Sequence, residues 1–183
     1  AAVVLYSPAI RDRSERLGAL FKPWSKFLME KTMTENGVMD MKRTGEKAEF
    51  WSEVQHLNAY ESLAILLYSE MNASTFSKVK QPLFLGYYYK SEEEQDPVVS
   101  VPKMLEMYNQ IGTPENLKRE KAFPKSGDHV IASSITSDDW QGVLFATIDF
   151  LENVVKVPAN PKYQEKVEEM TKAKELVESL DKN

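Results

Sequence analysis

Three short apolar runs, each followed by a segment of helical character, constrain the fold of this chain more than any other feature. The runs cover residues 1–6, 82–89 and, more weakly, 120–124. The first two are apolar almost throughout, as parallel strands are when helices cover both faces of their sheet. The alternation of such strands with helices predicts an α/β fold with about three parallel strands.

The longest gap between two of these runs, residues 11–80, shows no convincing strand. Its apolar residues recur at helical spacing over residues 17–28, with a break or kink at Pro23, and again over residues 50–71. Residues 34–46 are polar, contain two glycines and are typical of a loop or short turn structure. The segment is therefore expected to be a helical insertion after the first strand.

Two helices are expected in the second half of the chain, and a third at its end. Residues 101–111 carry apolar side chains at helical spacing, and Gly112 stands where a glycine often ends a helix. Another helix is expected over about residues 137–155, with Ser137 and the two following acids at its N-terminus. Residues 158–183 are strongly charged and predict an appended amphipathic helix.

Composition excludes several classes of function. With 42% apolar and 28% charged residues, the chain is long enough for one globular domain with a sizeable core. A formal net charge of −5 argues against nucleic acid or an anionic membrane as a partner. No apolar run approaches the ~20 residues of a membrane span. The lack of cysteine excludes disulfides, thiol catalysis and thiolate metal sites, without fixing the compartment.

Neither a metal nor a nucleotide cofactor is expected. The two histidines, His56 and His129, stand far apart, and the H-E-x-x-H spacing of zinc enzymes is absent from the sequence. The glycines form neither a P-loop nor the G-x-G-x-x-G pattern of dinucleotide-binding proteins. Any chemistry is therefore expected to come from ordinary side chains.

One histidine and one aspartate stand in the loops after the second and third runs. Asp96 lies in the acidic loop after residues 82–89, and His129 lies in a turn after residues 120–124. Histidine titrates near neutral pH and can remove the proton from a weak hydroxyl nucleophile. A buried carboxylate on its other ring nitrogen fixes the tautomer. His129 is therefore the candidate base, and Asp96 the candidate orienting acid.

Other interpretations of these residues stay open. His129 would otherwise be a surface-loop or core histidine, and Asp96 a turn-forming residue before a proline. Residues 92–94, three glutamates, and Asp128 compete with Asp96 for the role of acid. The glutamates are expected to be solvated, and Asp128 to cap local N–H groups. His56 is expected to be a structural histidine within a helix, with a place in a pocket lining as the alternative.

Four local features resemble the C-terminal half of the α/β-hydrolase family over residues 1–156. Residues 2–8 are similar to the sixth strand of that family and the start of its cap, and residues 11–80 stand where its helical cap is inserted. Residues 95–99, with the sequence QDPVV, resemble the loop that carries the triad acid. Residues 127–129, with the sequence GDH, resemble the loop that carries the triad histidine.

The resemblance implies the C-terminal part of an α/β-hydrolase sheet with a helical cap. Residues 1–10 and 81–157 would form the core, residues 11–80 the cap, and residues 158–183 an appended helix. The resemblance also implies that the candidate base and acid belong to a Ser-His-Asp triad. The G-x-S-x-G elbow that carries the serine of such a triad is absent from all 183 residues.

The missing elbow determines what is expected of function. The chain begins inside an apparent buried strand without an initiator Met, so residue 1 is expected to be a cut site and the serine to lie upstream. The whole protein is then expected to hydrolyse carboxylic esters, and these 183 residues alone to be inactive. Val3, Val4 and Leu5 would leave an apolar sheet edge that favours self-association or an N-terminal half of the same protein as partner.

Two other functions stay open, and the sequence does not fix the substrate. A non-catalytic interaction domain would keep this part of the fold without the elbow, and a peptidase would share the strand order. The Met and aromatic side chains of the insertion are expected to pack in a core, with a hydrophobic substrate pocket as the alternative. These side chains are Phe21, Trp24, Phe27, Met29, Met33, Met39, Met41, Phe50 and Trp51.

Overall fold

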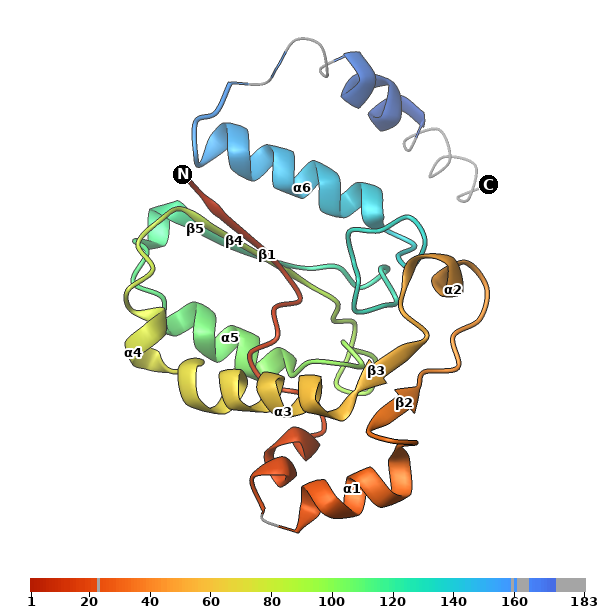
Figure 1. Ribbon diagram of the computed structural model, residues 1–183. Coiled ribbons are helices and arrows are strands. Elements are labelled where there is room, and N and C mark those ends of the chain that lie inside the picture. Colours follow the sequence, from red (N-terminus) through yellow and green to blue (C-terminus); the bar gives the residue numbers. More distant parts are fainter. Residues whose placement is uncertain (23, 159, 161–164, 174–183) are drawn as a thin grey trace.

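A parallel sheet of three strands lies at the centre of the computed structural model, which describes residues 1–22, 24–158, 160 and 165–173. The strands are β1 (Val3–Tyr6), β4 (Leu83–Tyr87) and β5 (Lys118–Ala122), in the order β1-β4-β5 (Figure 1). Both pairings are parallel, and Leu83 lies opposite Val3 on one side and Lys118 on the other. The predicted α/β class with a parallel sheet is confirmed.

Helices cover both faces of this sheet (Figure 1). α5 (Val101–Gln110) packs on the face to which Leu85 contributes, and α6 (Trp140–Asn153) packs on the opposite face, where Phe84 meets Phe150. Successive strand side chains point to opposite faces, so a strand covered on both sides must be apolar throughout. All five residues of β4 are buried, as predicted.

The two edges of the sheet differ in chemistry. β1 leaves Val3, Val4 and Leu5 half-buried, which agrees with the predicted apolar edge. β5 has the sequence Lys-Arg-Glu-Lys-Ala, and its three central residues are exposed. Lys118 is the buried member of this strand; its ammonium pairs with Glu115 at 2.7 Å. The residues of β5 have little strand character of their own, and pairing with β4 identifies them as a strand.

The insertion contains a second, antiparallel sheet that the sequence analysis missed. Its strands are β2 (Val38–Asp40) and β3 (Val54–His56), with Val38 opposite His56. The expectation that residues 11–80 hold no strand is therefore wrong. The expectation of a loop or short turn structure over residues 34–46 fails at Val38–Asp40 and at Glu46, where a helix begins, and holds for most of the other residues. Strands of three residues are too short to show the alternation by which a strand is recognised.

The helices of the insertion are also shorter and more numerous than predicted. Residues 17–28 divide between a 3-10 helix and α1, and the predicted kink at Pro23 falls outside the described residues. Residues 50–71 are interrupted by β3. The elements are the 3-10 helix Arg16–Phe21, α1 (Ser25–Met33), α2 (Glu46–Phe50), α3 (Leu57–Ile65), the π-helix Leu66–Glu70 and α4 (Ala73–Phe76).

Many large apolar side chains of the insertion are exposed rather than packed in a core. One buried cluster of the insertion consists of Leu20, Leu57 and Ala64, with Met29 packed against it, and Leu67 and Phe76 are also buried. Such a small cluster cannot accommodate all the apolar residues that recur at helical spacing. The expectation of core packing is therefore wrong for Phe21, Trp24, Phe27, Met33 and Phe50.

The end of α5 needs a glycine for a reason other than the predicted helix cap. α5 ends at Gln110, and Gly112 does not adopt the positive φ of a left-handed cap. A Cβ on Gly112 would instead overlap the Nζ of Lys80 and the carbonyl oxygen of Ser77. The missing side chain thus allows the segment after α5 to approach the segment after α4.

Replacing Gly112 with alanine is expected to lower the free energy of unfolding by about 1–3 kcal/mol, because the methyl group overpacks this contact. Urea unfolding of the purified chain measures the effect. Gly37→Ala is a useful comparison, because Gly37 has a φ of 78° and nothing within 4 Å of its added Cβ. That variant isolates backbone strain. A Gly112→Ala chain as stable as the wild type would contradict the close approach.

The helix predicted over about residues 137–155 begins later than expected. α6 begins at Trp140, and the hydroxyl of Ser137 accepts a hydrogen bond from the N–H of Asp139 at 3.2 Å in the turn before it. Residues 165–173 are helical, and most of the rest of the predicted helix over residues 158–183 lies outside the described residues. In the part of the chain that the structure describes, no helix is long and apolar enough to cross a membrane.

Candidate functional site

The loops after β4 and β5 bring Asp96 and His129 together. These strands are parallel neighbours, so the loops at their carboxyl ends emerge at the same edge of the sheet. Nδ1 of His129 lies 2.9 Å from Oδ2 of Asp96. The aspartate side chain is fully buried, whereas 27% of the histidine side chain is exposed. The arrangement therefore joins a buried carboxylate to an imidazole that solvent reaches.

The carboxylate of Asp96 has a hydrogen-bond donor on each oxygen. Oδ1 accepts from the N–H groups of Val98 and Val99, both at 2.9 Å, and Oδ2 faces His129. The alternative that Asp96 is a turn-forming residue is thus correct without excluding the contact with histidine. One side chain both closes its own turn and orients the imidazole.

The surroundings of Asp96 keep its carboxylate charged. Burial by itself would raise the pKa of Asp96, but the hydrogen bonds from His129, Val99 and Val98 outweigh burial and lower that pKa. A carboxylate that stays ionised away from water can hold the Nδ1–H tautomer of an imidazole and stabilise the cation formed when the ring gains a proton.

The lowered pKa of Asp96 predicts how stability responds to acid. Its contribution to the free energy of unfolding is complete above the unfolded-state pKa, near 4, and is lost as the pH falls through the lower folded-state pKa. Urea unfolding at a series of pH values below about 5 measures this loss. Asp96→Asn should flatten the curve in this window, and parallel curves for the two chains would contradict the prediction.

The loop of His129 is held by its neighbour Asp128. Oδ1 of Asp128 accepts from the N–H of Val130 at 3.0 Å, which is the local capping role predicted for it. Its Oδ2 pairs with the ammonium of Lys47 in α2 at 2.7 Å. The loop that carries His129 is therefore linked to the insertion by an ion pair between half-exposed side chains.

The other candidates from the sequence lie away from this pair. Glu92, Glu93 and Glu94 are exposed, as predicted, and bond to near neighbours in their own loop. His56 is exposed and is the last residue of β3, so its assignment as a structural histidine inside a helix is wrong. It directly precedes α3, which explains the error in placing it.

Ser7 is a residue of interest that sequence reasoning missed. It directly follows β1, is 3% exposed and has a φ of 43°. Among the described residues, its hydroxyl is the one buried side-chain polar group without a hydrogen-bond partner. Positive φ and an unpaired buried hydroxyl both cost stability, and such features concentrate at functional sites. The available signal was a serine directly after a buried strand and before a proline.

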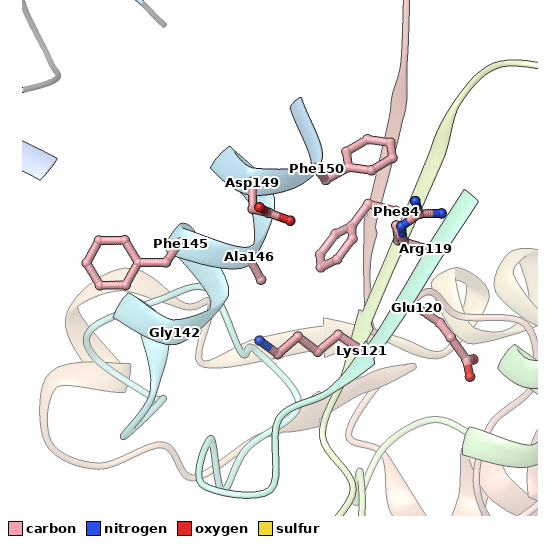
Figure 2. A pocket seen from close by; sticks show the side chains of 9 residues that line it. All are labelled: Phe84, Arg119, Glu120, Lys121, Gly142, Phe145, Ala146, Asp149 and Phe150. Carbon is pink, nitrogen blue, oxygen red and sulfur yellow. The ribbon is translucent and has the colours of Figure 1, made fainter. Parts of the chain in front are cut away.

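The structure also contains cavities away from Asp96 and His129. One of about 350 Å³ lies between β5 and α6, where Arg119 and Lys121 border Phe84 and Phe150 (Figure 2). Another, of about 800 Å³, is lined by the insertion and includes Met33. Neither cavity is lined by Asp96 or His129. Among residues 1–22, 24–158, 160 and 165–173, no group of three or more acidic or histidine side chains is placed to hold a metal ion.

Comparison with known proteins identifies the fold. No protein-family model and no curated protein matches the chain. A solved structure from work on LipS and LipT, two metagenome-derived lipolytic enzymes, has a TM-score of 0.57 and 20% identity, over 83% of this chain and 55% of its own. A soluble variant of monoglyceride lipase from Saccharomyces cerevisiae, in complex with a substrate analogue, has a TM-score of 0.52 and 15% identity, over 81% and 54%.

The chain spans about half the length of these two structures. At such identities the likeness concerns the fold, and it agrees with the parallel order of β1, β4 and β5 and with helices on both faces. The fold that this resemblance implies is thereby confirmed. This chain has part of the α/β-hydrolase fold.

Proposed function

We propose that this chain carries the histidine and the acid of a Ser-His-Asp hydrolase that acts on carboxylic esters. The observation that supports it most is the fully buried carboxylate of Asp96, 2.9 Å from Nδ1 of His129, in loops that follow two neighbouring parallel strands. The structural likeness to lipolytic enzymes supports an ester as substrate. In this proposal residues 1–10 and 81–157 belong to the hydrolase core, and residues 11–80 to its cap.

In this proposal Asp96 and His129 each have a defined role. Asp96 accepts the Nδ1–H of His129, which leaves Nε2 as the basic nitrogen of the ring. Nε2 takes the proton of the serine hydroxyl as the serine oxygen bonds to the ester carbonyl carbon. The proton then passes to the departing alcohol, and an acyl-serine remains. Nε2 next removes a proton from water as the water oxygen bonds to the acyl carbon, and it returns that proton to the serine oxygen as the acyl–oxygen bond breaks and the acid is released.

The serine of this triad is proposed to lie in a G-x-S-x-G elbow outside these 183 residues, because no such motif occurs within them. Without that elbow the chain has neither the nucleophile nor a complete oxyanion hole. The 183-residue chain by itself is therefore expected to be inactive toward esters.

Labelling with a fluorophosphonate, which reacts with activated serines, tests this proposal. The gene product as the cell makes it should be labelled at a serine, and its labelling should depend on His129. The isolated 183-residue chain should not be labelled. Absence of labelling in the whole gene product would contradict the hydrolase and favour the non-catalytic interaction domain. Labelled protein that cleaves peptides and not esters would favour the peptidase.

A further inference from the structure

Arg13, near the start of the insertion, reaches the main chain of the loop that holds Asp96. Its Nη1 donates hydrogen bonds to the carbonyl oxygens of Gln95 and Asp96, at 3.0 and 3.1 Å. These two carbonyls belong to the peptide groups on either side of the Asp96 Cα. One guanidinium nitrogen therefore contacts both peptide groups that set the direction of the aspartate side chain.

Main-chain pairing holds Arg13 beside this loop. The N–H of Arg13 donates to the carbonyl of Val98 at 2.9 Å, and the N–H of Ser100 donates to the carbonyl of Arg11 at 2.9 Å. Between them, Asp12 forms an antiparallel bridge with Val99. These are main-chain hydrogen bonds, so a substitution of the Arg13 side chain would not remove them. The two bonds of the guanidinium to Gln95 and Asp96 are additional.

Asp96 makes further hydrogen bonds with groups other than Arg13. Its N–H donates to the carbonyl of Tyr88, just after β4, at 3.1 Å. Its carboxylate is held by two N–H groups of its own turn and by His129. The main chain of Asp96 therefore lies between the end of β4 and the guanidinium of Arg13.

We infer that Arg13 is a positioning residue for Asp96. Its two hydrogen bonds fix the peptide groups around the aspartate and thereby the carboxylate that orients His129. Arg13 belongs to the insertion. A displacement of the insertion would therefore shift the main chain of Asp96 through these hydrogen bonds and change the orientation of the His129 imidazole. The inference rests on the proposed function, because the orientation of His129 affects turnover only if His129 is the base.

Three variants separate positioning from other effects. Arg13→Met removes the donors and keeps an aliphatic stem, and Arg13→Lys keeps a charge with donors on a shorter side chain. Arg16→Met is the matched control, because Arg16 is exposed and its guanidinium makes no hydrogen bond or ion pair among the described residues. Should Arg13→Met fail to fold, Arg13→Gln, which is uncharged and shorter, replaces it under the same criterion.

Proton NMR of the imidazole N–H groups reports the contact without any substrate. The sequence has two histidines, so the signals of His129 can be compared with those of exposed His56 in the same sample. In Arg13→Met the Nδ1 proton of His129 is expected to exchange with water about tenfold faster, as when an ordinary hydrogen bond no longer fixes its acceptor. Arg13→Lys should restore part of the protection, and Arg16→Met should match the wild type.

Wild-type exchange of the His129 Nδ1 proton in Arg13→Met would overturn the inference. In the protein that contains the nucleophile, Arg13→Met should lower kcat about tenfold with little change in KM; a change in KM alone would also overturn it. The proposed function fails separately, through hydrolysis that persists without His129. The NMR measurement therefore tests the positioning role of Arg13 whether or not the proposed hydrolase activity is correct.

Discussion

Replacing His129 with alanine is expected to lower kcat for ester hydrolysis on the order of 10⁵-fold in the protein that contains the nucleophile. The variant loses Nε2, which in the proposed mechanism takes the serine proton and then gives it to the leaving alcohol. It also leaves the carboxylate of Asp96 without the partner that lies 2.9 Å away. Turnover of a short-chain nitrophenyl ester, with the unfolding midpoint measured in parallel, gives the effect.

His56→Ala is the matched control for this experiment. His56 is the other histidine of the chain and is exposed at the end of β3. Its removal should leave kcat within about twofold of the wild type, as expected for a surface substitution. If both alanine variants keep wild-type turnover, the base is not among the histidines of this chain and the proposed site is wrong.

Replacing Asp96 with asparagine is expected to lower kcat on the order of 10⁴-fold while the loop keeps its shape. The remaining amide oxygen can still accept from the N–H groups of Val98 and Val99. The amide nitrogen would then face Nδ1 of His129 as a donor. The ring would have to accept there and carry its proton on Nε2, where a base is needed.

The exposed acids of the same loop provide the control. Glu93→Gln removes one negative charge from the loop of Asp96, and Glu93 contacts Ser91 rather than His129. Its turnover should equal that of the wild type. The pH of measurement should lie well above the lowered pKa of Asp96, so that the wild-type carboxylate is ionised. A fully active Asp96→Asn enzyme would show that another group orients His129.

The centre of the sheet was predictable because β4 is buried on both faces. β4 is apolar at every position and is bounded by a proline and an acidic loop, so its pattern and its ends are both visible in the sequence. β5 is the opposite case, because it lies at the sheet edge and three of its five residues are charged and exposed. Its assignment depended on the elements around it rather than on its own residues.

The insertion was predicted less well because its structure depends on contacts distant in sequence. β2 and β3 are three residues each and are stabilised by pairing with one another, which no local pattern reveals. The apolar spacing around Trp24 and Phe27 indicated a helix correctly, but the helix leaves both rings exposed. The spacing of apolar residues shows that a helix has an apolar face. Whether that face is buried depends on which other part of the protein packs against it.

At the candidate site, the aspartate and the histidine were predictable from the sequence, but the residues that hold their loops in place were not. Asp96 and His129 stand in the loops that follow two strand signals, so they could be named as candidates. The contacts of Arg13 and Lys47 with the two loops span more than 80 positions of the chain. Such contacts depend on how the insertion folds back, and no motif records them. Ser7 likewise became notable only through its φ and its unpaired hydroxyl.

The two edges of the sheet differ in how readily they would pair with a strand of another molecule. Charged side chains on an edge strand discourage the docking of a further strand, and β5 presents Arg119, Glu120 and Lys121. β1 has no such protection, since Val3, Val4 and Leu5 are half-buried and uncharged. Misassembly of the isolated chain should therefore begin at β1 and spare β5, so that a single lysine placed on β1 would act as a gatekeeper against fibre growth.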